Sequence, residues 1–168
     1  MTKKARIITF VLTGLSCIGC DRVTKDLAKT HLQFEAPKSY LNNFFRLEYV
    51  ENTGAALSLG DNLPQPYNFI LLSLLPIIFM VGLTFYVMRN ISTFNKLMLL
   101  SLSLIIAGGL GNIIDRILYD RHVTDFMNMG IGNVRTGIFN VADICVTAGA
   151  IGILLSYKSQ QKLPPATA

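Results

Sequence analysis

The chain has 168 residues, of which 51% are hydrophobic and only 15% charged, and its mean hydropathy is +0.46. Soluble domains carry about 25% charged residues, so this composition excludes disorder, a disulfide scaffold and an ordinary cytosolic enzyme, and it predicts a membrane protein. The net charge of +5 does not indicate nucleic-acid binding, because the basic residues lie between long apolar runs. The length corresponds to about one domain, and we expect residues 1–168 to form a single membrane domain.

Four apolar runs predict four membrane-spanning helices, since about 20 apolar residues cross the bilayer core. The predicted spans are residues 7–28, 67–88, 97–114 and 138–157. The first holds only 14 uncharged residues, Ile7 to Cys20, and must continue to about Ala28 to reach across. An alternative reading of this segment is a lipoprotein signal peptide that ends at Cys20. Cys17 stands where such peptides usually have a branched apolar residue, and three further spans follow, so we favour a span.

The basic residues indicate the orientation of these spans in the membrane. Seven of them, and no acidic residue, fall on one side: Lys3, Lys4, Arg6, Arg89, Lys96, Lys158 and Lys162. Short cytoplasmic segments are enriched in Lys and Arg. Both termini are therefore predicted to be cytoplasmic.

The connections on the other side predict a small β-sheet. Residues 45–49 alternate apolar and polar side chains, which is typical of a half-buried strand. Asn52, Thr53 and Gly54 read as a turn, and residues 55–59 as a returning strand. Residues 126–134 alternate more weakly. The predicted fold is an α-helical membrane protein with four transmembrane helices and a small extracytoplasmic β-sheet between the first and second spans.

Polar residues cluster at the outer level of the spans. They are Asp21, Lys25, Asn112, Asp115, Arg116, Asn140 and Asp143, and the outer segments can add Asn52 and Asp125. Asp143 lies five residues into its predicted span, about 8 Å deep, and an acid there predicts a function.

Several members of this cluster also fit structural roles. Asp21 and Lys25 form an ordinary helix pair four residues apart, and Asp115 beside Arg116 fits a buried ion pair that fixes helix register. The glycines at positions 108, 109 and 111 fit close packing against a neighbouring helix.

The inventory of reactive side chains favours carboxylate chemistry. Two nearby carboxylates do not both ionise easily, so one can activate water while the other donates a proton. No set of zinc ligands is evident, and the three cysteines are expected to be free thiols. The alternative is a proton-linked carrier with Asp143 and Asp115 as a relay, but its ionisable groups should extend across the membrane.

Five motifs occur in order along the chain. They are Asp21-Arg22-Val23-Thr24-Lys25, Asn52-Thr53-Gly54-Ala55-Ala56, Gly108-Gly109-Leu110-Gly111-Asn112-Ile113-Ile114-Asp115-Arg116, Val123-Thr124-Asp125-Phe126 and Phe139-Asn140-Val141-Ala142-Asp143. Together they resemble the motifs of the bacterial lipoprotein signal peptidases, also called signal peptidase II, over most of the chain. One departure is Arg22, where the family's first motif usually has Gln.

The resemblance implies a membrane aspartic peptidase that needs no cofactor or metal. Its substrates would be prolipoproteins with a diacylglyceryl-modified cysteine, cut at the outer face of the bacterial cytoplasmic (inner) membrane. Its other partners would be membrane lipids, its state monomeric, and the antibiotic globomycin would bind it. An inactive family member that only binds such substrates remains an alternative.

The resemblance also implies a role for each residue of the cluster. Asp125 and Asp143 would be the catalytic pair. Four residues would shape the site and hold the substrate: Asn112, Asp115, Arg116 and Asn140. The outer sheet would contribute Asn52 and Gly54. Structural support would come from Asp21 and Lys25.

Overall fold

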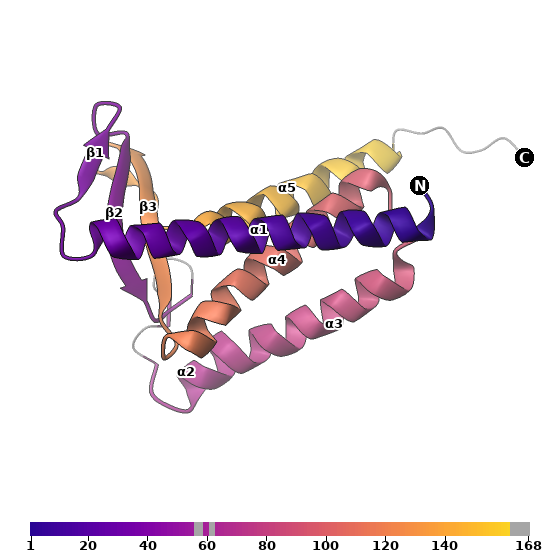
Figure 1. Cartoon of the computed structure of the whole chain (residues 1–168), viewed down its shortest axis with the longest axis horizontal. Coiled ribbons are helices and arrows are strands. Elements are labelled where there is room, and N and C mark those ends of the chain that lie inside the picture. Colours follow the sequence, from indigo (N-terminus) through magenta and orange to yellow (C-terminus); the bar gives the residue numbers. More distant parts are fainter. Residues whose placement is uncertain (56–58, 61–62, 162–168) are drawn as a thin grey trace, which may run out of the picture.

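Four long helices run side by side, and a small sheet lies across one end of them (Figure 1). The computed structural model of the chain describes residues 1–55, 59–60 and 63–161. The helical elements are α1 (Lys3–Leu32), α2 (Tyr67–Phe69), the π-helical turn η2 (Ile70–Leu74), α3 (Leu75–Asn90), α4 (Lys96–Leu118) and α5 (Val141–Gln161). Within the described residues, four helices are long and apolar enough to span a membrane, which confirms the predicted class.

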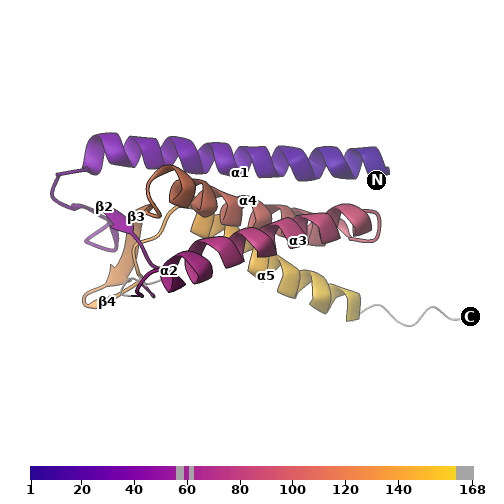
Figure 2. The same ribbon diagram turned by 90° about the horizontal axis from the view of Figure 1, so that it is seen from below.

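α4 lies in the middle of the bundle and contacts α1, α3 and α5 (Figure 2). Its glycines permit this position, because each leaves room for a different neighbour. A Cβ atom at Gly108 would collide with the Ala142 carbonyl of α5, and one at Gly109 would lie 2.5 Å from Met80 of α3. At Gly111 it would lie 2.9 Å from the Asp21 carboxylate of α1. The predicted packing role of these glycines is confirmed.

Two helix boundaries differ from the sequence prediction. α1 runs from Lys3 to Leu32, beyond the predicted 7–28, because charged side chains near its outer end are buried in pairs rather than exposed to lipid. α5 begins at Val141, not at 138. Asp143 therefore lies in the first turn of α5, so the expectation that it sits five residues deep in a span is wrong.

The second span is continuous but not a uniform α-helix. Its first part contains the π-helical turn, and Pro76 follows at the start of α3. Proline has no backbone N–H for a hydrogen bond to the preceding turn, and a widened turn accommodates that loss.

The sheet is antiparallel and draws on both outer connections. Its order is β1 (Lys38–Tyr40), β2 (Phe45–Asn52), β3 (Val123–Ile131) and β4 (Val134–Arg135). The strands predicted from residues 45–49 and 126–134 are confirmed, whereas β1 was not predicted. β2 pairs with β3, so the sheet joins the connection between the first two spans to that between the last two. The returning strand predicted at 55–59 falls mostly outside the described residues.

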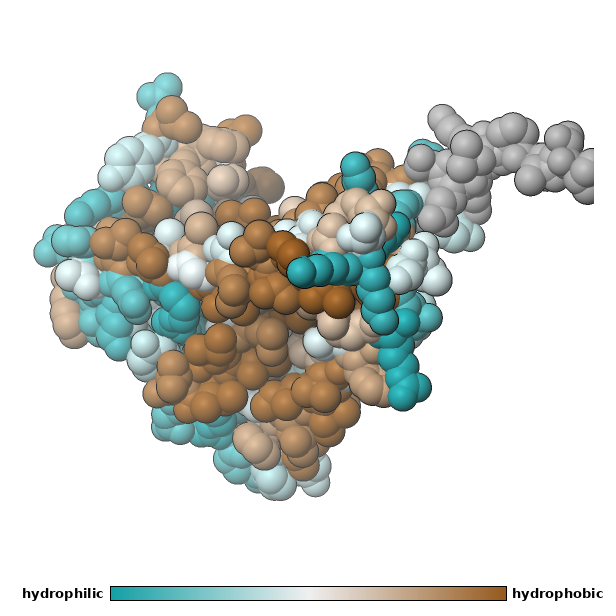
Figure 3. All heavy atoms as spheres, turned by 45° about the vertical axis from the view of Figure 1, so that its right-hand side comes forward, coloured by the Kyte–Doolittle hydropathy of each residue, from teal (hydrophilic) through white to brown (hydrophobic). Residues whose placement is uncertain are grey.

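Side chains on the outside of the bundle suit a lipid environment. Figure 3 shows apolar surface over the middle of the helices, with polar surface toward the sheet and toward the end bearing the N-terminus. Large apolar side chains such as Leu15, Val81 and Leu154 are more than 60% exposed. Such a surface is unfavourable in water and fits lipid, where only satisfied helical backbones cross.

The close approach at Gly108 is open to a direct test. Gly108→Ala should lower the free energy of unfolding by about 1–3 kcal/mol, because the added methyl group meets the α5 backbone and Val146. An SDS titration of purified protein in mixed micelles measures this change. Gly82→Ala is the matched control, since nothing lies within 4 Å of a Cβ atom there. Equal stability of the two variants would contradict the packing role.

Candidate active site

Asp125 and Asp143 border one cavity of about 850 Å³ at the sheet end of the bundle. Asn52, Asn112 and Arg116 line its polar part with them. Its remaining wall is mostly apolar and comes from η2, the start of α3, the 136–139 segment and α5. The cavity thus joins two carboxyl groups to an apolar groove between two membrane-spanning helices.

β3 carries Asp125, and two amide groups hold its carboxylate. Asn52 Nδ2 donates to Oδ2 at 2.9 Å, and Asn140 Nδ2 donates to Oδ1 at 2.7 Å. Asp125 is buried, with only 3% of its surface exposed. Burial is the main cause that raises the pKa of Asp125 to about 6, and the Asp143 charge adds to it, while the two amides partly offset the rise.

Asp143 is held in the same manner at the N-terminus of α5. Its Oδ2 accepts from the Asn140 backbone N–H at 3.0 Å, and Asn140 Oδ1 accepts from the Asp143 N–H at 3.0 Å. This reciprocal pair is a capping box, which satisfies N–H groups that the first turn leaves free. Asn112 Nδ2 donates to Oδ1 at 2.9 Å. The helix N-terminus also favours negative charge at this position.

Asn140 connects the two aspartates. It is fully buried, and its Nδ2 lies 2.7 Å from Asp125 Oδ1 and 3.1 Å from Asn112 Oδ1. It precedes α5 as the capping residue of that helix. One amide side chain therefore orients both carboxyl groups at once.

A buried ion-pair network lies beside the cavity. Lys25 Nζ lies 2.8 Å from Asp21 Oδ2, 2.8 Å from Asp115 Oδ2 and 3.0 Å from Asn112 Oδ1. Asp21, Lys25 and Asp115 are at most 1% exposed. Arg22 also pairs with Asp115, so two carboxylates and two cations balance. A buried charge is tolerated only when it is paired and hydrogen-bonded in this way.

This network reaches the backbone next to each of the two aspartates. Asp21 Oδ1 accepts from Ala142 N–H at 2.8 Å, one residue before Asp143. Asp115 Oδ2 accepts from Thr124 N–H at 3.2 Å, one residue before Asp125. The expected Asp21–Lys25 pair is confirmed. The expected Asp115–Arg116 pair is wrong, because Asp115 turns toward α1 and binds Lys25 and Arg22.

Arg116 instead binds the loop that follows β2. Its Nη2 donates to the Gly54 carbonyl at 2.6 Å. Gly54 N–H donates to Asn52 Oδ1 at 2.9 Å, and Asn52 Nδ2 also reaches the Ala55 carbonyl at 3.2 Å. The same loop therefore holds Asn52 against Asp125.

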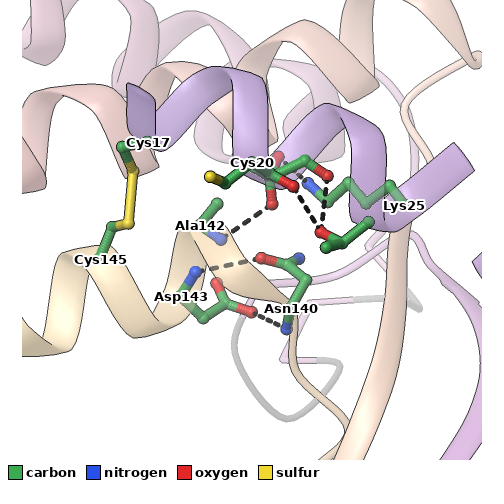
Figure 4. The surroundings of a disulfide bond; sticks show 9 residues. Cys17, Cys20, Lys25, Asn140, Ala142, Asp143 and Cys145 are labelled. Carbon is green, nitrogen blue, oxygen red and sulfur yellow. Dashed lines mark hydrogen bonds and ion pairs between the residues drawn. A yellow bond between two sulfur atoms is a disulfide. The ribbon is translucent and has the colours of Figure 1, made fainter. Parts of the chain in front are cut away.

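Sequence reasoning missed two features of this region. It did not assign Arg22 or the Thr124 backbone to the network, because their partners are distant in the chain. It also expected free thiols, whereas Cys17 of α1 and Cys145 of α5 form a disulfide with a Cα–Cα distance of 6.9 Å (Figure 4). Cys17 lies one turn before Asp21, where the Asp21–Ala142 bond brings α1 against α5. Only Cys20, of the three cysteines, is free.

The described residues include no group of three or more His, Cys, Asp and Glu side chains suited to hold a metal ion. All ten predicted site residues lie in the cavity wall or in the network and loop that touch it.

Comparisons of the sequence and of the structure with known proteins agree with one another. Residues 13–158 match the family model for signal peptidase (SPase) II. The lipoprotein signal peptidase of Francisella tularensis subsp. novicida is 33% identical over 144 residues, which cover 86% of this chain and 88% of that protein. That of Streptococcus pneumoniae is 31% identical over 165 residues, 96% of this chain and 97% of that one. A bacterial membrane enzyme solved in meso at 2.3 Å resolution is 28% identical with a TM-score of 0.81, over 96% of this chain and 94% of its own.

The ion-pair network predicts a large effect of Lys25 on stability. Lys25→Met leaves Asp21 and Asp115 buried with one cation fewer and should lower the free energy of unfolding by about 3–5 kcal/mol. Lys29→Met, one turn later and exposed, should change it by less than about 1 kcal/mol. SDS titration in mixed micelles compares the two. If Lys25→Met is no worse than its control, the network does not support the fold.

Proposed function

This chain belongs to the signal peptidase II family, and on that premise we propose that Asp125 and Asp143 form the catalytic pair of a lipoprotein signal peptidase. The family is one of peptidases that cleave lipoprotein signal peptides. The observation that carries the proposal is that both carboxyl groups border one cavity and share Asn140 as hydrogen-bond donor.

The proposed reaction is hydrolysis by a water molecule held between the two carboxyl groups. The ionised aspartate takes a proton from the water, whose oxygen attacks the scissile carbonyl carbon. The protonated aspartate then gives its proton to the amide nitrogen as the C–N bond breaks. In this proposal the two carboxyl groups share one proton. Burial and mutual repulsion make such sharing favourable near neutral pH, as the pKa of about 6 for Asp125 indicates.

The cavity supports a substrate that itself lies in the membrane. Leu71, Leu72 and Ile151 line its apolar part, which leads from the carboxyl groups along η2 and α5. We infer that the apolar signal helix of a prolipoprotein lies there, with the diacylglyceryl-modified cysteine near the polar end. Each buried CH₂ of its acyl chains adds about 0.8 kcal/mol of membrane anchoring, which keeps the scissile bond at the interface.

We further propose that both termini are cytoplasmic and that the site faces outward from the inner membrane. The N-terminus, the turn between α3 and α4 and the end of α5 lie opposite the sheet (Figure 1). Six basic residues lie in or next to these segments: Lys3, Lys4, Arg6, Arg89, Lys96 and Lys158. A cytoplasmic position for this end follows the positive-inside rule, and the carboxyl pair at the other end then faces outward. We propose a monomer, since one chain supplies every residue of this site.

The proposed pair is tested by Asp125→Asn and Asp143→Asn. Each should lower conversion of a lipid-modified prolipoprotein at least about 100-fold, because an amide replaces the group that transfers a proton. Conversion is followed by gel mobility, and globomycin should block it in the parent protein. Asp120→Asn is the control, since that carboxylate is exposed outside the cavity. A variant at 125 or 143 that processes substrate like the parent would refute the assignment.

The pH dependence of conversion should report on Asp125. The profile of kcat/KM against pH should have one limb with its midpoint near pH 6. The Asn52 hydrogen bond stabilises the ionised carboxylate of Asp125 and thereby lowers its pKa. Asn52→Ala removes this bond, so the pKa should rise and the limb should move to higher pH. The measurement is kcat/KM against pH, with Asn133→Ala as an exposed control. A limb that stays in place or moves to lower pH in Asn52→Ala would contradict this environment for Asp125.

A further inference from the structure

A second cavity of about 270 Å³ lies on the other side of Arg116, between the second span and the end of α4. Its wall consists of Phe69, Ser73, Ile77, Ile113, Arg116, Ile117 and Arg121. Ile117 is 67% exposed and Phe69 45% exposed, so the cavity borders the lipid-facing surface. Only Arg116 also lines the cavity of the carboxyl pair.

Two buried polar atoms in this wall have no hydrogen-bond partner among the described residues. They are the Ser73 hydroxyl oxygen, on a residue only 5% exposed, and Arg116 Nε. An unpaired buried polar group costs about 1–3 kcal/mol, so native structures rarely leave one without a ligand or water. Two such atoms in the wall of one cavity point to a ligand that accepts hydrogen bonds.

The charges of the cavity favour an anion. Among the described residues of its wall, Arg116 and Arg121 are the charged ones and none is acidic. Arg116 forms no ion pair in the described part of the chain, and its Nη2 donates to the Gly54 carbonyl. Asp125, Asp143 and Asp115 lie close enough to interact with it electrostatically, but none of them lines this cavity. Arg121 has a contact of 3.8 Å with Asp120, whose side chain is 89% exposed, and such surface pairs contribute little.

Local backbone structure places the two arginines together. Arg121 N–H donates to the Arg116 carbonyl at 2.9 Å in the turn that ends α4. Both arginines line the cavity, at and just after the end of α4 nearest the sheet. Ser73 is six residues beyond Tyr67, about 9 Å deeper at 1.5 Å per residue, and Ile77 is about one turn deeper again.

We propose that this cavity binds one anionic phospholipid, with its phosphate between Arg116 and Arg121. The Ser73 hydroxyl donates to an ester carbonyl, and an acyl chain lies along Ile77 and Ile113. The cavity combines two cations, a hydroxyl and an apolar wall, which suit the phosphate, the ester and the acyl chain of a lipid. Free phosphate would leave Ser73 and the apolar wall unoccupied, so a lipid fits this cavity better than a free anion does. The site shares Arg116 with the proposed peptidase cavity, but the binding test does not depend on peptidase activity.

Native mass spectrometry of the full chain in detergent tests this site, with phosphatidylglycerol, phosphatidylcholine and inorganic phosphate as probes. One phosphatidylglycerol should bind, more tightly than phosphatidylcholine. Arg121→Gln should weaken its binding about tenfold, because one charge-assisted contact is lost. Ser73→Ala should weaken both lipids, since both carry ester carbonyls.

Arg46→Gln is the matched control, because Arg46 lies on β2 at the same end of the molecule and lines neither cavity. Equal binding by Arg121→Gln and Arg46→Gln would overturn the proposal, as would equal binding of the two lipids. Displacement of the lipid by millimolar phosphate would also overturn it and assign the arginines to a free anion.

Discussion

The buried ammonium group of Lys25 is the interaction on which the rest of the site depends. It holds Asp21 and Asp115 on two different helices, and each of these carboxylates binds a backbone N–H beside one of the two cavity aspartates. The start of α5 and the start of β3 are thus positioned by one cation. Three charged groups are buried here, and each needs its partners in place to offset the cost of its burial. The three contacts therefore form together, which makes the arrangement rigid.

The cavity aspartates receive a different kind of contact from the supporting ones. Their hydrogen bonds come from the amides of Asn52, Asn112 and Asn140 and from backbone, whereas lysine and arginine bind Asp21 and Asp115. A cation in direct contact would favour the ionised form of a carboxylate more strongly than an amide does, because the amide carries no net charge. Asn112 accepts a hydrogen bond from Lys25 and donates one to Asp143. It therefore positions the Asp143 carboxyl group without bringing a cation into contact with it. Such an environment suits the proton sharing that we propose for the two aspartates.

Sequence could predict what depends on local spacing. The apolar runs predicted the spans, the spacing of Asp21 and Lys25 predicted their pair, and the glycines of α4 predicted close packing. It could not predict partners chosen by tertiary structure: Asp115 binds α1 instead of its neighbour Arg116, and Cys17 meets Cys145 across 128 positions. The depth of Asp143 was misjudged because uncharged residues 138–140 extend the apolar run without being helical.

Arg22 shows how this chain balances charge where the family motif usually has glutamine. With glutamine, two buried carboxylates would share the single charge of Lys25. Arg22 supplies the second cation directly to Asp115, and its guanidinium also lies 5.5 Å from the centre of the Tyr119 ring. The second cation balances the second buried carboxyl group, and charge-assisted hydrogen bonds are stronger than those between neutral groups. The departure therefore strengthens the support of Thr124, and through it the position of Asp125, rather than weakening the site.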